Sequence, residues 1–212
     1  MFIRKHIRAI QHWRKRHAPI FLLAAGLFLV SIISYAYYMS SQRLSVNQDS
    51  YQPLLSLIGK VESNDNYNAH FGNSQNSTVK FTDMSISQVL QWQKDFVAQG
   101  SPSSAVGRYQ IINGTLEGLV NQLGISADQK FDERTQDAMA IALLERRGSV
   151  EYVNGELSDD DFAANLAKEW AALPKITGEN PEQSYYAGDG LNQSRVKSNE
   201  VLDAIEPIEA DK

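Results

Sequence analysis

Apolar residues between positions 53 and 205 recur every three or four residues, which is typical of amphipathic helices. Pro53 suits a first helical turn, and the apolar residues after it share one side: Leu54, Leu55, Ile58 and Val61. Four more helices are predicted from their capping residues, which are Ser85 or Ser87, Thr115, Asp132 and Ser158. Their expected ends are Gly100, Gly124, Gly148 and Pro174. The pattern therefore predicts a mainly α domain.

Polar segments without helical period interrupt these helices. Residues 64–80 are rich in Asn, Ser and Gly and predict a loop or a short irregular hairpin. Residues 99–108 and 174–195 also predict loops. No extended sheet is expected.

The N-terminal part of the chain follows a different pattern. Residues 18–39 contain no charged residue, and their 22 positions are enough to cross a bilayer. Six Lys or Arg residues precede them, so we predict a transmembrane signal-anchor with a cytoplasmic N-terminus. The alternative is a signal peptide cleaved after the small residues Ser34 and Ala36. The predicted organisation is a basic leader (1–17), an anchor (18–39), a tether (40–52), a catalytic domain (53–205) and an acidic tail (206–212).

Charge and composition limit the chemistry. The 212-residue chain has a net charge of −5, but residues 40–212 hold 14 Lys or Arg against 25 Asp or Glu, a net of −11. Such an acidic body argues against binding of nucleic acid. Cysteine is absent, and three of the four histidines fall in residues 1–17. We therefore expect no metal site and no cofactor.

Glu62 interrupts the apolar pattern of the first predicted helix. At 100° per residue it lies about 40° from Ile58, inside the apolar sector. Burial and the negative end of the helix dipole both disfavour a charged carboxylate there. A raised pKa would make Glu62 a proton donor near neutral pH. The alternatives are a glutamate paired with a buried arginine, or one that faces solvent at the end of the helix.

Several short motifs together resemble the lysozyme of bacteriophage lambda and its relatives, a family of peptidoglycan lytic transglycosylases of the lysozyme-like superfamily. The resemblance rests on "VESND" at 61–65 and "SSAVGRYQI" at 103–111, supported by "FTDMS" at 81–85, "QLGI" at 122–125, "TQDAMAIALLERRG" at 135–148 and "WAALP" at 170–174. These motifs keep the family's order across residues 53–195. The resemblance implies an α+β lysozyme-like fold, with a helical body and a small irregular β or loop region beside a glycan cleft.

The resemblance also implies roles for particular residues. Glu62 corresponds to the family's catalytic acid. The Gly-Arg-Tyr-Gln element of the glycan-binding cleft corresponds to Gly107, Arg108, Tyr109 and Gln110. Within the motifs and the later loop we add five substrate-binding candidates: Ser63, Asp83, Ser104, Tyr185 and Tyr186.

The function implied is cleavage of the bond between N-acetylmuramic acid and N-acetylglucosamine in peptidoglycan, with a 1,6-anhydro product. The alternatives are a muramidase that uses water, and a non-catalytic, anchored glycan-binding adaptor. The expected partners are peptidoglycan glycan strands and, through residues 18–39, the cytoplasmic membrane. The expected location is the inner membrane of a bacterium, with the catalytic domain on the periplasmic side.

Overall fold

The structure is a computed structural model that describes residues 46–210. The predicted leader, the anchor and residues 40–45 of the predicted tether lie outside the described residues, as do the last two residues. Between residues 46 and 210, no helix has the length and apolar character needed to cross a membrane. The tether's last residues and most of the acidic tail pack with the domain, since Tyr51 and Ile208 are buried and the Asn47 N–H donates to the Glu209 carbonyl over 2.9 Å.

Residues 46–210 are mainly helical, as the apolar period predicts. The α-helices are α2 (Gln52–Ser63), α3 (Ile86–Ala98), α4 (Asn113–Leu123), α5 (Glu133–Arg146), α6 (Ser149–Val153), α7 (Asp159–Leu166) and α8 (Ser198–Ile205). Two short 3-10 helices, η1 (Gln48–Tyr51) and η2 (Phe81–Asp83), precede α2 and α3. In place of strands, this part of the chain holds isolated β-bridges, such as the one between His70 and Val106.

Three of the predicted helix starts are confirmed by their side-chain hydrogen bonds. The Ser85 hydroxyl accepts from the Gln88 N–H, and the Gln88 side chain returns to the Ser85 N–H, which completes a capping box at α3. The Asp132 carboxylate caps α5 by accepting from the Thr135 N–H over 2.9 Å. Ser158 caps α7 in the same way.

Other boundaries were predicted wrongly. The helix expected to start after Thr115 already begins at Asn113, and its N-cap residue is Ile112, which makes no side-chain cap. Helix α7 ends at Leu166, well before Pro174, and Trp170 lies outside the helix, after a turn at residues 167–169. The short helices α6 and α8 were not predicted, because their N-cap residues, Gly148 and Lys197, do not mark a helix start as Ser158 does for α7.

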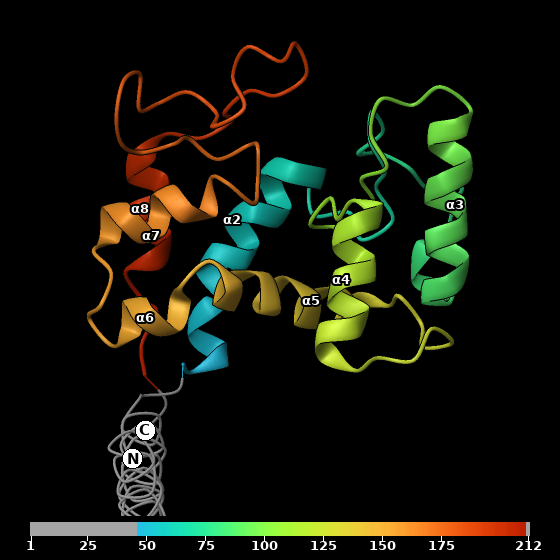
Figure 1. Ribbon diagram of the computed structural model, residues 1–212, viewed down its shortest axis with the longest axis horizontal. Helices are drawn as coiled ribbons and strands as arrows, with labels where there is room; N and C mark the ends of the chain where they lie inside the picture. The colour runs from blue at the N-terminus through green and yellow to red at the C-terminus, as the bar shows by residue number, and fades with distance from the viewer. Residues whose placement is uncertain (1–45, 211–212) are drawn as a thin grey trace, which may run out of the picture. The chain divides into compact units, whose positions relative to one another are not determined.

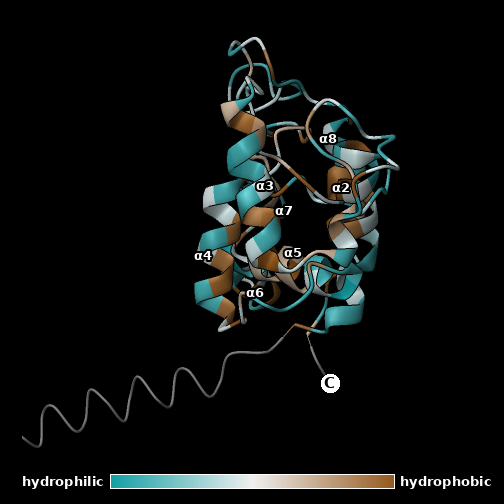
Figure 2. Cartoon of the chain, turned by 90° about the vertical axis from the view of Figure 1, so that its right-hand side faces the viewer, coloured by the Kyte–Doolittle hydropathy of each residue, from teal (hydrophilic) through white to brown (hydrophobic). Residues whose placement is uncertain are grey.

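The helices form two groups that α5 connects. Helices α3 and α4 pack against each other on one side, while α2, α7 and α8 pack together on the other (Figure 1). Helix α5 contacts α4 at one side and α6 at the other. Teal and brown segments alternate along α2 and α4 in Figure 2, as expected of helices that bury one face. The buried faces share one apolar core whose largest members are Tyr51, Phe81, Tyr109, Phe131 and Phe162.

The predicted loop at residues 64–80 is irregular, and asparagine side chains hold it together. The Asn66 amide donates to the Ser74 and Asn76 carbonyls, both over 2.9 Å. The buried Asn76 side chain donates to the Val79 carbonyl and accepts from the Val79 N–H. A loop without ladder hydrogen bonds needs such side-chain partners for its buried backbone, which explains why this segment is rich in Asn.

Candidate active site

Helix α2 ends abruptly directly after Glu62 and Ser63. Asn64 and Asp65 both adopt left-handed backbone conformations, with φ of 57° and 60°. Their N–H groups fold back onto α2, where they donate to the Lys60 and Gly59 carbonyls over 3.1 and 3.0 Å. Asn and Asp tolerate this conformation better than other non-glycine residues, so the "SND" sequence itself stops the helix. The turn fixes Glu62 in the last turn of α2, beside the loop that follows.

The Glu62 side chain is partly buried between α2 and two distant segments. Its Oε1 atom accepts a hydrogen bond from the Ala172 N–H over 3.2 Å. The Ala172 carbonyl accepts from the Arg195 N–H over 2.8 Å, and an Arg195 Nη1–H donates to the Val61 carbonyl over 2.9 Å. The carboxyl is therefore enclosed with the help of Ala172 and Arg195, which lie 110 and 133 positions further along the chain.

Glu62 opens onto a cleft of about 640 Å³. One part of its lining comes from the loop at residues 70–74 and the segment that contains Pro102, Ser103 and Ala105. Another part comes from residues 169–171 and from the loop at residues 174–195, the late loop. Further lining residues are Gln110, Ile112, Tyr186, Leu191, Asn192 and Arg195. The cleft therefore brings together residues from across the domain around a single acidic side chain of α2.

Burial raises the pKa of Glu62 from its ordinary value of 4.5 to about 7. The hydrogen bond from Ala172 and the positive charge of Arg195 both oppose this shift, and burial outweighs them. Among the described residues, no lysine or arginine forms an ion pair with the Glu62 carboxylate. The group is therefore about half protonated near neutral pH, as a general acid requires.

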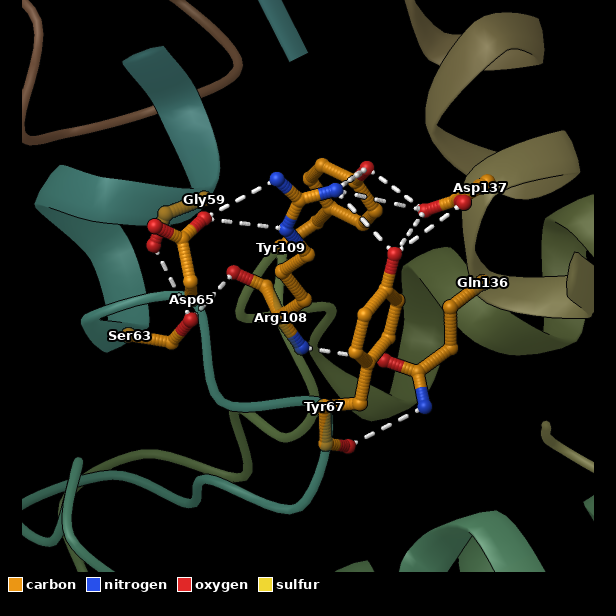
Figure 3. A network of polar contacts seen from close by, with 8 residues as sticks. All are labelled: Gly59, Ser63, Asp65, Tyr67, Arg108, Tyr109, Gln136 and Asp137. Atoms are coloured by element: carbon orange, nitrogen blue, oxygen red, sulfur yellow. Dashed lines mark hydrogen bonds and ion pairs between the residues drawn. The ribbon is translucent and has the colours of Figure 1, made fainter. Parts of the chain in front are cut away.

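The Arg108 side chain lies at the centre of a polar network on another side of the α2 end (Figure 3). Its guanidinium donates to Asp65 Oδ1 over 2.9 and 3.2 Å, and to the Tyr67 and Tyr109 hydroxyls over 3.1 and 2.9 Å. Both tyrosine hydroxyls in turn donate to the Asp137 carboxylate on α5, over 2.8 and 2.6 Å. The network ties α2, the 64–80 loop and α5 to the Gly-Arg-Tyr-Gln segment.

Two glycines make room for this network. Gly107 has a φ of +79°, and a Cβ there would clash with the Gln136 side chain, whose Oε1 accepts from the Arg108 N–H over 2.9 Å. A Cβ at Gly59 would clash with the Arg108 guanidinium. Gly107 therefore allows a close approach of this segment to Gln136 of α5.

The structure brings three of the predicted site residues into one cleft: Glu62, Gln110 and Tyr186. Ser63 is buried, and its hydroxyl donates to the Gly59 and Arg108 carbonyls. The other candidates lie outside the lining of this cleft; they are Asp83, Ser104, Gly107, Arg108, Tyr109 and Tyr185. Of these, Asp83 and Tyr185 are exposed, whereas Tyr109 is only 1% exposed and its hydroxyl is already paired.

Several lining residues were not predicted from the sequence. Arg195 and Asn192 come from the late loop, whose sequence has no recognisable motif. Glu169 lies in a turn after α7, and Trp170 is only 2% exposed, with most of its surface in the core. His70 lines the cleft and packs against Trp92 and Phe96, with ring centroids 5.4 and 5.1 Å apart. Within residues 46–210, no three His, Asp or Glu residues cluster in a way that could bind a metal.

Comparison with known proteins places the chain in a family. No curated protein and no solved structure matches it. The family model described as Endolysin matches residues 50–194, which is most of the chain and nearly all of the described domain. This match confirms the resemblance to phage lysozyme-like enzymes that the motifs indicate. The chain therefore belongs to the Endolysin family and is, in general terms, a peptidoglycan-cleaving enzyme of the glycosidase type.

Proposed function

We propose that the protein is a lytic transglycosylase that cleaves the bond between N-acetylmuramic acid and N-acetylglucosamine, with Glu62 as general acid and then general base. Glu62 donates its proton to the bridging oxygen, and the N-acetylglucosamine leaves. The glutamate, now a carboxylate, takes the proton of the muramic acid 6-hydroxyl as that oxygen attacks the anomeric carbon. The products are a shorter glycan and a 1,6-anhydro end, and no water is consumed.

The observation that carries the proposal is the position of Glu62 in the cleft, where its carboxyl has one backbone hydrogen bond and, among the described residues, no ion-pair partner. Burial holds its pKa at about 7, so proton donation is available near neutral pH. Gln110 and Tyr186 line the same cleft, where the Gln110 amide oxygen and the Tyr186 hydroxyl oxygen can accept hydrogen bonds from the sugar's acetamido and hydroxyl groups.

The lack of a free second carboxylate favours transglycosylation over hydrolysis. Most glycosidases use two carboxylates, and the second one acts as nucleophile or activates a water. Of the described residues that line the cleft, only Glu62 and Glu169 are acidic, and Glu169 is paired with Arg146 and Arg147. Asp65 is paired with Arg108. A substrate hydroxyl that attacks within its own sugar needs no such second group.

Product analysis tests this proposal against the muramidase and adaptor alternatives. Purified peptidoglycan is digested with the wild-type chain, with Glu62→Gln and with Glu179→Gln, a matched change at an exposed position outside the cleft. We expect the wild type and Glu179→Gln to release fragments with anhydro ends, which weigh one water less than reducing ends, and Glu62→Gln to release none. Reducing ends would show a muramidase, and equal release by all three, or by none, would exclude catalysis by Glu62.

We further propose that residues 18–39 anchor the enzyme in the cytoplasmic membrane of a bacterium, with the catalytic domain on the periplasmic side. The support is the uncharged 22-residue stretch and the six positive charges before it. An anchor would confine cleavage to glycan within reach of the membrane. Fractionation tests this: the full chain should pellet with membranes and resist extraction with carbonate, and a variant without residues 1–45 should not. Recovery of the full chain in the soluble fraction would contradict the anchor.

A further inference from the structure

A second pocket, of about 470 Å³, adjoins the Glu62 cleft. Five residues line both hollows: Gln110, Ile112, Glu169, Trp170 and Tyr186. Because the two hollows share these lining residues, they lie side by side in the domain. Further lining of the second pocket comes from α4 and the last turn of α5, including Thr115 and Leu143.

The second pocket is positively charged in an otherwise acidic domain. Residues 46–210 contain 12 Lys or Arg against 24 Asp or Glu. Three of those 12 cations, Arg146, Arg147 and Lys168, line this one pocket, and Glu169 is the only carboxylate among the described residues around it. One small site therefore holds a quarter of the cations of residues 46–210. The local excess of positive charge favours an anionic ligand.

The cations are held in place before any ligand arrives. Glu169, whose side chain is 9% exposed, accepts from Arg147 over 2.7 Å and from Arg146 over 3.3 Å. The side chains of Arg147 and Arg146 stay 29% and 40% exposed despite these contacts. The Lys168 ammonium donates to Asn165 Oδ1 over 2.9 Å, and the Lys168 carbonyl accepts from the Tyr186 hydroxyl over 2.8 Å and from Arg147 over 3.2 Å. Arginines oriented in this way suit carboxylates, which their N–H groups bind in pairs.

We propose that this pocket binds the carboxylates of the peptide stem carried by muramic acid, so that the enzyme selects peptide-bearing glycan over bare glycan. The inference rests on the proposed function, because it places a muramic acid in the Glu62 cleft. The lactyl group of that sugar carries the peptide, and the peptide's free carboxylates are the anionic substituents nearest to the scissile bond. Glycan stripped by an amidase keeps one lactyl carboxylate on each muramic acid but lacks the peptide carboxylates, which are the groups that the three cations recognise in this proposal.

The test compares two substrates and two matched double variants of the full chain. The substrates are intact peptidoglycan strands and the same strands after an amidase has removed the peptides. Arg146→Gln with Lys168→Gln removes two pocket cations but keeps the Arg147–Glu169 pair. Lys130→Gln with Arg134→Gln removes two exposed cations outside the pocket, on and just before α5.

We expect the wild type to have a lower KM for peptide-bearing strands than for stripped strands. The pocket variant should raise KM on peptide-bearing strands about tenfold, since two charge-assisted contacts are lost, and should abolish most of that preference. The control variant should keep the preference. The inference is overturned if the wild type cleaves both substrates equally well, or if the pocket variant changes KM by the same factor on both. Cleavage of neither substrate by the wild type would instead overturn the proposed function, and this inference with it.

Discussion

Two carboxylates three residues apart at the end of α2 have opposite surroundings. Asp65 is 53% exposed and accepts two hydrogen bonds from Arg108, within a network that reaches Asp137. Glu62 lies in the cleft with one backbone hydrogen bond and, among the described residues, no ion-pair partner, and burial raises its pKa to about 7. The comparison shows how one helix end supports both parts of a site: a charged network fixes the loops, and an unpaired acid is left for chemistry.

The largest expected effect is on activity, which should depend strongly on Glu62 and only weakly on Asp65. Glu62→Gln removes the proton donor, so activity on peptidoglycan should fall by about 10²- to 10⁴-fold. Asp65→Asn weakens one exposed ion pair and should cost less than about tenfold. Turbidity clearance of purified cell walls measures both. Equal losses in the two variants would mean that the difference in their surroundings has no catalytic meaning.

The next largest effect is a loss of stability when the polar network around Arg108 is broken. Arg108→Gln leaves the neighbouring tyrosine and aspartate groups without their central donor. The guanidinium side chain is only 13% exposed, so we expect the free energy of unfolding to drop by about 2–4 kcal/mol. Urea unfolding at neutral pH measures this change. Glu62→Gln is the control, because its side chain has no part in the network and should not lower stability there; a loss as large as that of Arg108→Gln would contradict the contrast.

A smaller effect concerns the pH dependence of activity. The charge of Arg195 lowers the pKa of Glu62, against the larger effect of burial. Arg195→Gln should therefore move the alkaline limb of the activity profile to higher pH, because Glu62 then keeps its proton longer. Lys197→Gln, two residues away and outside the cleft lining, should leave the limb in place. A shift of the limb to lower pH, or none, would show that Arg195 does not act on Glu62 through its charge.

Much of the fold follows from local sequence, but the site's surroundings do not. The helical period and the Asn-Asp stop place Glu62 correctly in the last turn of α2, since both depend on neighbours in the chain. The partners that enclose it, Ala172 and Arg195, lie more than a hundred residues further on, in segments without a motif.

Arg108 is a second example of what local sequence does not predict. Its motif predicts a residue that contacts glycan, yet its side chain is used by Asp65, Tyr67 and Tyr109. That use depends on where α5 and the 64–80 loop pack, which composition and spacing do not encode. Ser63 and Gly107 likewise lie where they fix the backbone beside the cleft rather than in its lining.

The central claim is that burial keeps a proton on Glu62 near neutral pH. Titration of the side-chain carboxyl carbons by NMR, in protein labelled with ¹³C-glutamate and compared with Glu62→Gln to assign the signal, measures it directly. The expected midpoint for Glu62 is about 7, and the remaining glutamates serve as internal references. A midpoint near the ordinary value of 4.5 would contradict the account, because the carboxyl would then be ionised when the glycan binds.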